Sequence, residues 1–255
     1  MKKIICIIII FSFSEMIYTQ ETLGLVTKSK GKVEYKKYSS KKFTTDIYRG
    51  LGLYGDDNIR TGDNGFSMYR YLDDGSSIKI LKNSDIKIQG RINNRRIEKN
   101  VEVNNGLFNF DIDKQDNASF TVVTPTSVAT VKGTDFWLIC NGPEGDRFLG
   151  VEGDVEVKNI ESGSIVILNE DSVVVSSSSG NISVQNMTPD DLQEIEDLND
   201  ESGEYEDLDI DTGFDDNQDI DQDAGISSDS DEENIIRIQF EDTFGNSKEI
   251  IIKYK

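Results

Sequence analysis

Between residue 21 and about residue 185, short runs of residues alternate between apolar and polar side chains. Such alternation places one face of a strand in a core and the other face in water. Gly, Asn and Asp residues separate the runs and predict tight turns at 62–65, 73–75, 82–84 and 104–106. The pattern predicts an all-β domain over 21–185, built as a sandwich or a short solenoid of many short strands. The clearest strand runs are 32–35, 67–72, 77–81, 85–88, 101–103, 120–123 and 155–157.

The first 20 residues have the pattern of a signal peptide. Two lysines precede the apolar run 4–11, which is shorter than the roughly 20 residues of a membrane-crossing helix. We therefore expect an exported protein, periplasmic or secreted to the cell surface, without a stable transmembrane span; an uncleaved anchor is the alternative. Removal of this segment also removes Cys6. It leaves Cys140, which follows an apolar run and is expected to be a buried core thiol.

A helical pattern begins only after Thr188, and it predicts a short helix within 186–200. Thr188 suits the N-cap, because its hydroxyl can accept a bond from a backbone N–H of the first turn. Pro189 suits the first helical position, because the N–H that Pro lacks would have no partner in the helix there. Leu192, Ile195 and Leu198 form an apolar stripe expected to dock on the β body. Two apolar runs within 234–255 flank Gly245-Asn246 and predict a β-hairpin. An isolated hairpin is marginal, so it is expected to pair with an edge of the body or with another molecule.

The formal charge of −21 is concentrated in one segment. Residues 190–233 hold 21 acidic residues and no Lys or Arg, and the other 27 acidic residues are balanced by the 27 basic ones. Such a block repels itself and has little to bury, so 201–233 is predicted to be a largely disordered acidic linker.

Calcium binding is the alternative for this segment, because Ca²⁺ prefers several carboxylate oxygens. The EF-hand pattern is not met, since Gly213 and Gly225 fall one place late and Gln218 and Ser230 occupy the twelfth positions. No other cofactor is expected. The calcium candidates are Asp207, Asp209, Asp211, Asp219, Asp221 and Asp223.

The chain contains no His, which excludes Ser-His-Asp and Cys-His catalytic arrangements within it. Paired carboxylates could serve glycoside hydrolysis, but no spacing singles out such a pair. We therefore expect no enzymatic activity. Nucleic acid is not an expected partner, because binding to its phosphates needs an excess of Lys and Arg.

Four ordered motifs resemble those of the FecR domain. Residues 56–65 (Asp-Asp-Asn-Ile-Arg-Thr-Gly-Asp-Asn-Gly) are similar to a GD-x-I-x-TG-x-x-G signature, and Leu-Asp-Asp-Gly-Ser follows at 72–76. The stretch 122–136 is similar to the family's V-x-T-P to GT-x-F core, and 151–157 to its terminal strand. The resemblance covers 50–160 and implies a FecR-like β domain.

The motif residues also have structural interpretations. The glycines at 62, 65, 75, 133 and 153 are expected at positive φ or at close backbone approaches. Thr124-Pro125 should end a strand, Asp74 and Asn83 should bond their own turns, and Arg60 is expected to pair with an acid such as Asp74. The motif residues expected to serve the fold are Arg60, Thr61, Gly62, Gly65, Asp74, Gly75, Thr124, Pro125, Gly133, Thr134, Phe136 and Gly153.

The FecR resemblance implies a regulatory role. Proteins of this kind carry a cytoplasmic anti-sigma segment, a membrane helix and a periplasmic FecR domain that receives a signal from an outer-membrane receptor. Only three residues precede the apolar run here, so we expect an exported, stand-alone FecR domain. It is expected to act as a non-enzymatic binding or signal-sensing module of the cell envelope, through contacts with an envelope protein, such as an outer-membrane receptor, or a glycan. The alternative is a cation-binding structural or adhesive surface protein.

Overall fold

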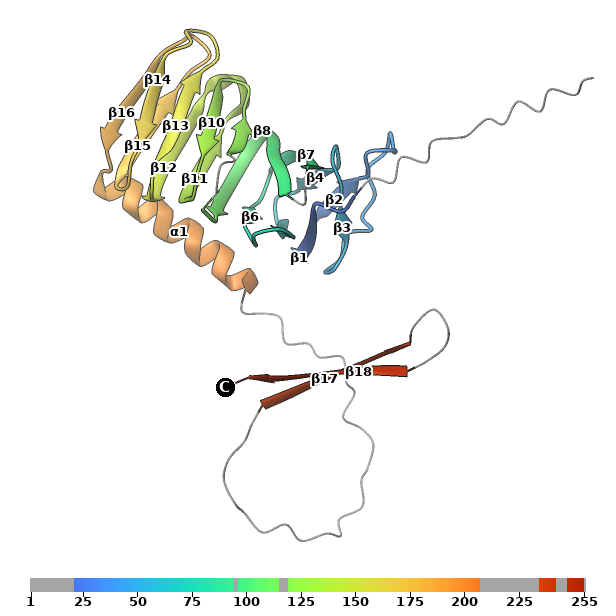
Figure 1. Cartoon of the computed structure of the whole chain (residues 1–255). Helices are drawn as coiled ribbons and strands as arrows, with labels where there is room; N and C mark the ends of the chain where they lie inside the picture. The colour runs from blue at the N-terminus through green and yellow to red at the C-terminus, as the bar shows by residue number, and fades with distance from the viewer. Residues whose placement is uncertain (1–20, 94–95, 115–118, 207–233, 242–246, 255) are drawn as a thin grey trace, which may run out of the picture. The chain divides into compact units, whose positions relative to one another are not determined.

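The computed structural model describes residues 21–93, 96–114, 119–206, 234–241 and 247–254 (Figure 1). The chain divides into two units, Met1–Asp211 and Thr212–Lys255, and each is described by itself. The predicted signal peptide, the acidic segment 207–233 with all six calcium candidates, and the hairpin turn at Gly245-Asn246 lie outside the described residues. The acidic linker therefore stays a prediction.

The first unit consists of two β layers that share one long strand, which confirms the all-β prediction. All strand pairs are antiparallel except β8 with β9, which is parallel. In spatial order, the first layer contains β3 (Gly52–Leu53), β1 (Gly24–Lys30), β5 (Phe66–Tyr71), β6 (Ser77–Ile80), β8 (Arg96–Ile112), β11 (Thr134–Cys140), β12 (Asp146–Glu152), β15 (Ser172–Ser176) and β16 (Ile182–Asn186). The second contains β2 (Val33–Lys36), β4 (Asn58–Thr61), β7 (Asp85–Asn93), β8, β9 (Phe120–Val123), β10 (Ser127–Val131), β13 (Val155–Asn159) and β14 (Ile165–Leu168).

The main core lies between these layers and is rich in aromatic rings. Phe110 and Phe136 stack with ring centroids 5.0 Å apart, and Phe120 and Phe148 lie beside them. These side chains and Cys140 are buried, as the alternation of the strands predicts. Burial raises the pKa of the Cys140 thiol, so this cysteine is an inert core residue.

The predicted turn at 104–106 is wrong, because these residues lie inside the 17-residue strand β8. The N-terminal part of β8 pairs with β7, and the part from Gly106 onward pairs with β6 and β11. Gly106 has a φ of 127°, and a Cβ placed there would lie 2.2 Å from the Ser84 hydroxyl oxygen. The glycine therefore redirects the strand from one layer to the other instead of reversing it.

Helix α1 (Pro189–Glu206) covers the outer face of the first layer and extends six residues past the predicted end at 200. Leu198 and Ile195 pack on a second apolar cluster that contains Trp137. Leu192 was expected in the same stripe, but it is 48% exposed. The remaining members of the cluster are Phe66, Met68, Leu81, Ile139, Leu149 and Val173.

The start of α1 is fixed by a reciprocal cap. The backbone N–H of Asp191 donates to the Thr188 hydroxyl at 3.3 Å, and the N–H and hydroxyl of Thr188 both donate to the Asp191 carboxylate. Arg147 on β12 binds Asp191 and Glu194 at 2.6 and 2.8 Å. Within the described residues, no helix combines the length and hydropathy needed to cross a membrane.

The second unit contains an antiparallel pair of strands, β17 (Asn234–Glu241) and β18 (Ser247–Tyr254). Asn234 pairs with Tyr254 and Glu241 with Ser247, so the two strands are matched in length. The expected pairing of this hairpin with the body or another molecule stays a prediction.

Candidate functional site

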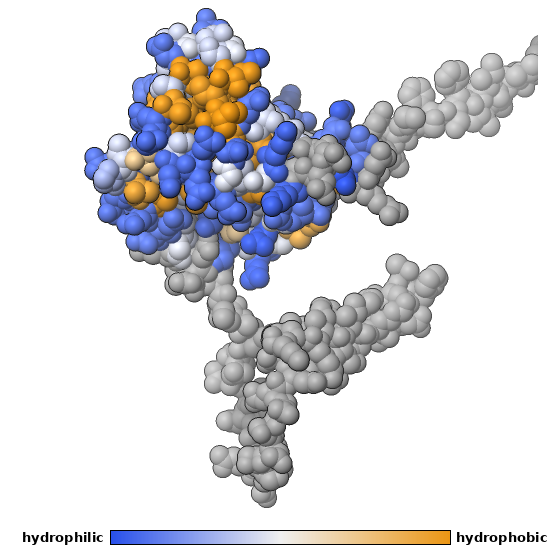
Figure 2. All heavy atoms as spheres, turned by 60° about the vertical axis from the view of Figure 1, so that its left-hand side comes forward, coloured by the Kyte–Doolittle hydropathy of each residue, from blue (hydrophilic) through white to orange (hydrophobic). Residues whose placement is uncertain are grey.

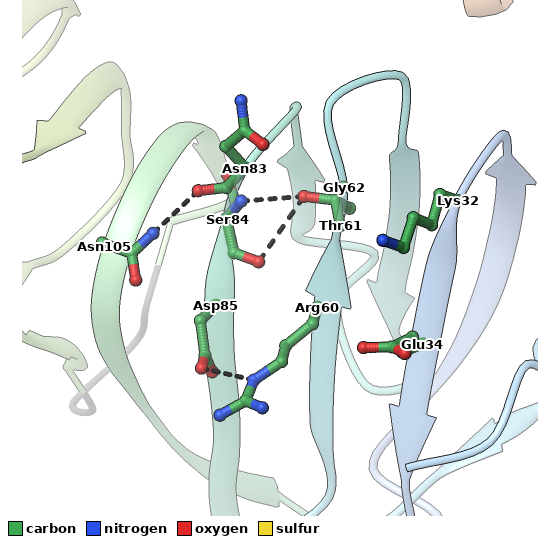
Figure 3. A pocket seen from close by; sticks show the side chains of 9 residues that line it. All are labelled: Lys32, Glu34, Arg60, Thr61, Gly62, Asn83, Ser84, Asp85 and Asn105. Atoms are coloured by element: carbon green, nitrogen blue, oxygen red, sulfur yellow. Dashed lines mark hydrogen bonds and ion pairs between the residues drawn. The ribbon is translucent and has the colours of Figure 1, made fainter.

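Arg60 is held rigidly at the edge of a polar pocket in the second layer (Figure 3). Its Nε donates to Asp85 Oδ2 at 2.6 Å, and its guanidinium lies 4.1 Å above the centroid of the Phe43 ring. The second Asp85 oxygen accepts a bond from the Asn58 amide at 3.0 Å. The Nη groups of Arg60 donate to no other described residue, and the Arg60 side chain is 46% exposed. Arg60 therefore presents two donor groups in a fixed orientation.

The expected partner of Arg60 was an acid such as Asp74, and this is corrected by the structure. Asp74 lies in the β5–β6 turn, where it accepts a bond from Ser76 N at 2.9 Å and from Lys99 Nζ at 2.7 Å. Asp73 also accepts from Lys99, at 2.8 Å. Asp85 becomes the partner of Arg60 because β4 pairs with β7, and their register places residues 60 and 85 directly opposite each other.

The rear of the pocket is built by two crossed turns. Ser84 N donates to the Thr61 hydroxyl at 2.9 Å, and that hydroxyl donates to Leu81 O at 2.5 Å. Asn83 has a φ of 53°, and the amide of Asn105 donates to its carbonyl at 2.7 Å. The sequence predicts that the Asn83 side chain bonds its own turn. In the structure Asn83 contributes through its backbone instead, which is left-handed and whose carbonyl accepts the Asn105 bond. These bonds fix the loops beside Arg60.

Across the pocket, Lys32 and Glu34 stand at the start of β2 (Figure 3). Among the described residues, neither side chain forms an ion pair. Gly62 and Gly65 allow this strand to approach, since a Cβ would lie 2.6 Å from the Lys32 side chain or 2.2 Å from its carbonyl oxygen. The pocket has a volume of about 320 Å³ and is open to solvent. Its free groups are the Lys32 ammonium, the outer edge of the Arg60 guanidinium, the Glu34 carboxylate and the Asn83 side-chain amide, which suit a polar ligand group.

A basic loop, residues 36–49, borders the pocket through Phe43. Five of its 14 residues are Lys or Arg and one is acidic, in a chain with a net charge of −21. Lys36 Nζ lies 5.0 Å from the Phe43 ring centroid, and Lys37 Nζ lies 5.7 and 5.6 Å from those of Tyr38 and Tyr54. The cations are therefore arranged around aromatic rings that remain partly exposed.

Asp57 anchors both ends of this loop from beneath. It is fully buried and accepts bonds from Tyr38 N at 2.8 Å, Tyr54 N at 2.9 Å and Tyr35 Oη at 2.6 Å. Burial raises the pKa of Asp57, although the three donors act in the opposite direction. Burial also raises the pKa of Tyr35, so its hydroxyl remains a donor at neutral pH. Asp57 is a positioning residue for the basic loop, since its carboxylate has no access to solvent.

The motif residues from Thr124 onward lie away from this pocket, in turns and in the core. Pro125 follows the end of β9, and the Thr124 and Thr126 hydroxyls donate to the buried Asp146 carboxylate. Thr124, Thr126 and Asp146 are all buried, so their hydrogen bonds stabilise the turn and are not accessible to a ligand.

Three motif glycines adopt positive φ: Gly75 at 82°, Gly133 at 136° and Gly153 at 76°. A Cβ on Gly153 would lie 2.8 Å from the Gly133 carbonyl oxygen, so the two turns pack directly against each other. Thr134 begins β11 and is buried, and Phe136 belongs to the core.

The structure thus brings Arg60, Thr61 and Gly62 together in one pocket with Lys32 and Glu34. The motifs did not single out the basic loop; its signal was the run of five cations among aromatic residues at 36–49. No cluster of three or more His, Cys, Asp or Glu residues with metal-binding geometry occurs in the described part of the chain.

Comparisons with known proteins match the central part of this body. Residues 57–156 match the family model described as FecR protein. Two crystal structures, both titled "putative anti-sigma factor from Parabacteroides distasonis", align at 18% sequence identity, with TM-scores of 0.45 and 0.44. Each alignment covers 53% of this chain and 62% of that chain, which is less than two thirds of its length. A comparison with curated proteins found no match. The chain therefore contains a segment, residues 57–156, that matches the FecR protein family.

Proposed function

We propose that this protein is an exported, non-enzymatic signal-sensing module of the cell envelope. It acts through contacts between its Arg60 pocket and an envelope protein or glycan that carries acidic groups. The FecR match supports a regulatory role. An outer-membrane receptor is one partner of this class.

The observation that carries the proposal is the fixed and open guanidinium edge of Arg60. Asp85 holds its Nε and Phe43 holds one face, so little side-chain entropy is lost when a ligand binds. The ammonium of Lys32 and the basic loop add positive charge beside it. A carboxylate or another anionic group would meet two preorganised donors there.

The test is site-specific photo-cross-linking of the full chain in the cells that naturally produce it. A benzoylphenylalanine at position 34 lies in the pocket wall, and one at Glu196, another acidic residue, exposed on α1, is the matched control. We expect a covalent adduct with an envelope protein or glycan from position 34 alone. Adding R60A should reduce its yield about tenfold, because a charge-assisted bond is lost.

Protein and glycan partners are distinguished by digesting the adduct with proteinase or with glycosidases. Equal adducts from positions 34 and 196, or an adduct that R60A leaves unchanged, would contradict the role of the pocket. Recovery of the chain only in the cytosolic fraction would contradict export.

A further inference from the structure

The two β layers end together, at strands β14 and β16. β14 closes the second layer and pairs with β13, and β16 closes the first layer and pairs with β15. The two end strands contact each other across the core (Figure 1). Among the described residues, no strand continues either layer, so each presents a free backbone edge. We call this surface the open end.

The open end exposes apolar side chains on both the inner and the outer side of its strands. Val184 pairs with Val174 and therefore points toward the core, where Val174 is fully buried. Val184 is nevertheless 47% exposed, because no further strand covers it. Ile165 and Ile167 on β14 pair with the exposed residues Lys158 and Glu156, so they lie on the outer face of the second layer, where they are 53% and 44% exposed. Figure 2, which turns this end forward, shows an apolar area on the surface.

Both end strands are short, with four and five residues, but neither carries the charges or bulges that blunt a sheet edge. Natural edges are blunted by Lys, Pro, bulges or inward-pointing charges. The segments 162–169 and 172–189 contain no charged residue, although 29% of the chain is charged. β14 pairs with β13, and β16 with β15, without a register shift. These features are typical of an interface and of the uncapped end of a stacked β structure.

The charge distribution favours a second copy of this chain as the occupant. The charge of −21 lies within 190–233 and the rest of the chain is formally neutral, so two copies meet with least repulsion at an uncharged surface outside that segment. The open end meets this condition, whereas an oppositely charged partner would gain nothing from it. An antiparallel edge also matches its own copy about a two-fold axis.

We infer that two copies associate end to end through the open end. β14 pairs antiparallel with its counterpart, β16 does the same in the other layer, and each sheet continues into the second copy. Ile167, in the middle part of β14, then lies near its own counterpart. The pair is isologous, with Val184 near the continued core and Ile165 and Ile167 on the outer face of the second layer.

The test is sedimentation velocity of the full chain over a range of concentrations. We expect a reversible dimer that becomes tighter when salt rises from about 50 to about 500 mM, because screening weakens the like-charge repulsion. I167K and I167E should each weaken the dimer at least tenfold. An equimolar mixture of the two should restore association, because opposite charges then face each other at the axis. L192K changes a similarly exposed apolar residue on α1 and serves as the control.

Circular dichroism melts show whether the variants fold like the wild type. A wild-type chain that stays monomeric at all concentrations would overturn the inference. So would a dimer that I167K leaves intact or that the two charged variants fail to restore. Association lost only on L192K would assign the interface to the helix.

Discussion

Replacement of Asp57 tests whether one buried carboxylate holds the basic loop in place. Three donors from separate parts of the chain converge on it: Tyr35 Oη, Tyr38 N and Tyr54 N, at 2.6, 2.8 and 2.9 Å. D57A leaves all three without this acceptor, while D57N keeps the shape but places an amide N–H₂ against two donors. D46N, on the same loop but exposed, is the matched control.

The expected cost follows from the burial of each donor. An unsatisfied buried donor costs about 1–3 kcal/mol. The Tyr35 hydroxyl is buried and its loss falls near the upper value, whereas the two backbone N–H groups are partly buried and can recruit water. We therefore expect D57A to lower the free energy of unfolding by about 4 kcal/mol and D57N by about 2 kcal/mol, with D46N within about 0.5 kcal/mol of wild type.

Urea unfolding gives these free energies, and amide hydrogen exchange locates the change. Protection should fall first at the amides of Tyr38 and Tyr54, while the amides of β11 remain protected in the folded state. A D57A cost below about 1 kcal/mol, or unchanged exchange across the basic loop, would refute the reasoning.

Three further substitutions test other parts of the fold. Thr188 and then Arg147 lower the pKa of Asp191 from its ordinary 3.8, so its carboxylate stabilises the fold above that pH and loses this effect as the pH falls through the lowered pKa. D191N should therefore cost about 1–2 kcal/mol at pH 7 and little near pH 2, as measured by urea unfolding at both. K99M should cost about 3 kcal/mol in thermal melts, because Lys99, 2% exposed, balances two aspartates; a cost under 1 kcal/mol would contradict this. G106A should cost more than about 2 kcal/mol, whereas G163A, also at positive φ but in open space, should cost about 1 kcal/mol; equal costs would refute the crowding argument.

The strands could be predicted because the two-residue alternation is a local property. Each predicted run from 32–35 to 155–157 overlaps a strand of the structure. The predicted turn at 104–106 is wrong for the same reason: the sequence Asn-Asn-Gly is compatible both with a hairpin turn and with a bent strand. What decides between them is Ser84, which packs where a Cβ of Gly106 would lie and comes from a distant turn.

The site was less predictable, because its contacts depend on register. Asp74 and Asp85 are both acidic residues near turns that follow Arg60 in sequence, and only the pairing of β4 with β7 selects Asp85. The apolar stripe of α1 shows a similar limit. The spacing predicts that Leu192 and Leu198 lie in one buried stripe, but only Ile195 and Leu198 reach the cluster around Trp137.

The Arg60 pocket and the open end lie at opposite ends of the strand order in the second layer. The pocket is built on β2 and β4, and the open end is formed by β14, the last strand of that order. An end-to-end dimer would therefore leave both pockets free, one on each distal end. For a partner with a single binding group, pocket occupancy and dimerisation should then be thermodynamically independent, so R60A should leave the sedimentation behaviour unchanged and I167K should leave the position-34 adduct intact. A partner with two or more binding groups within reach would gain affinity from the dimer without any new contact, because the second binding event becomes intramolecular.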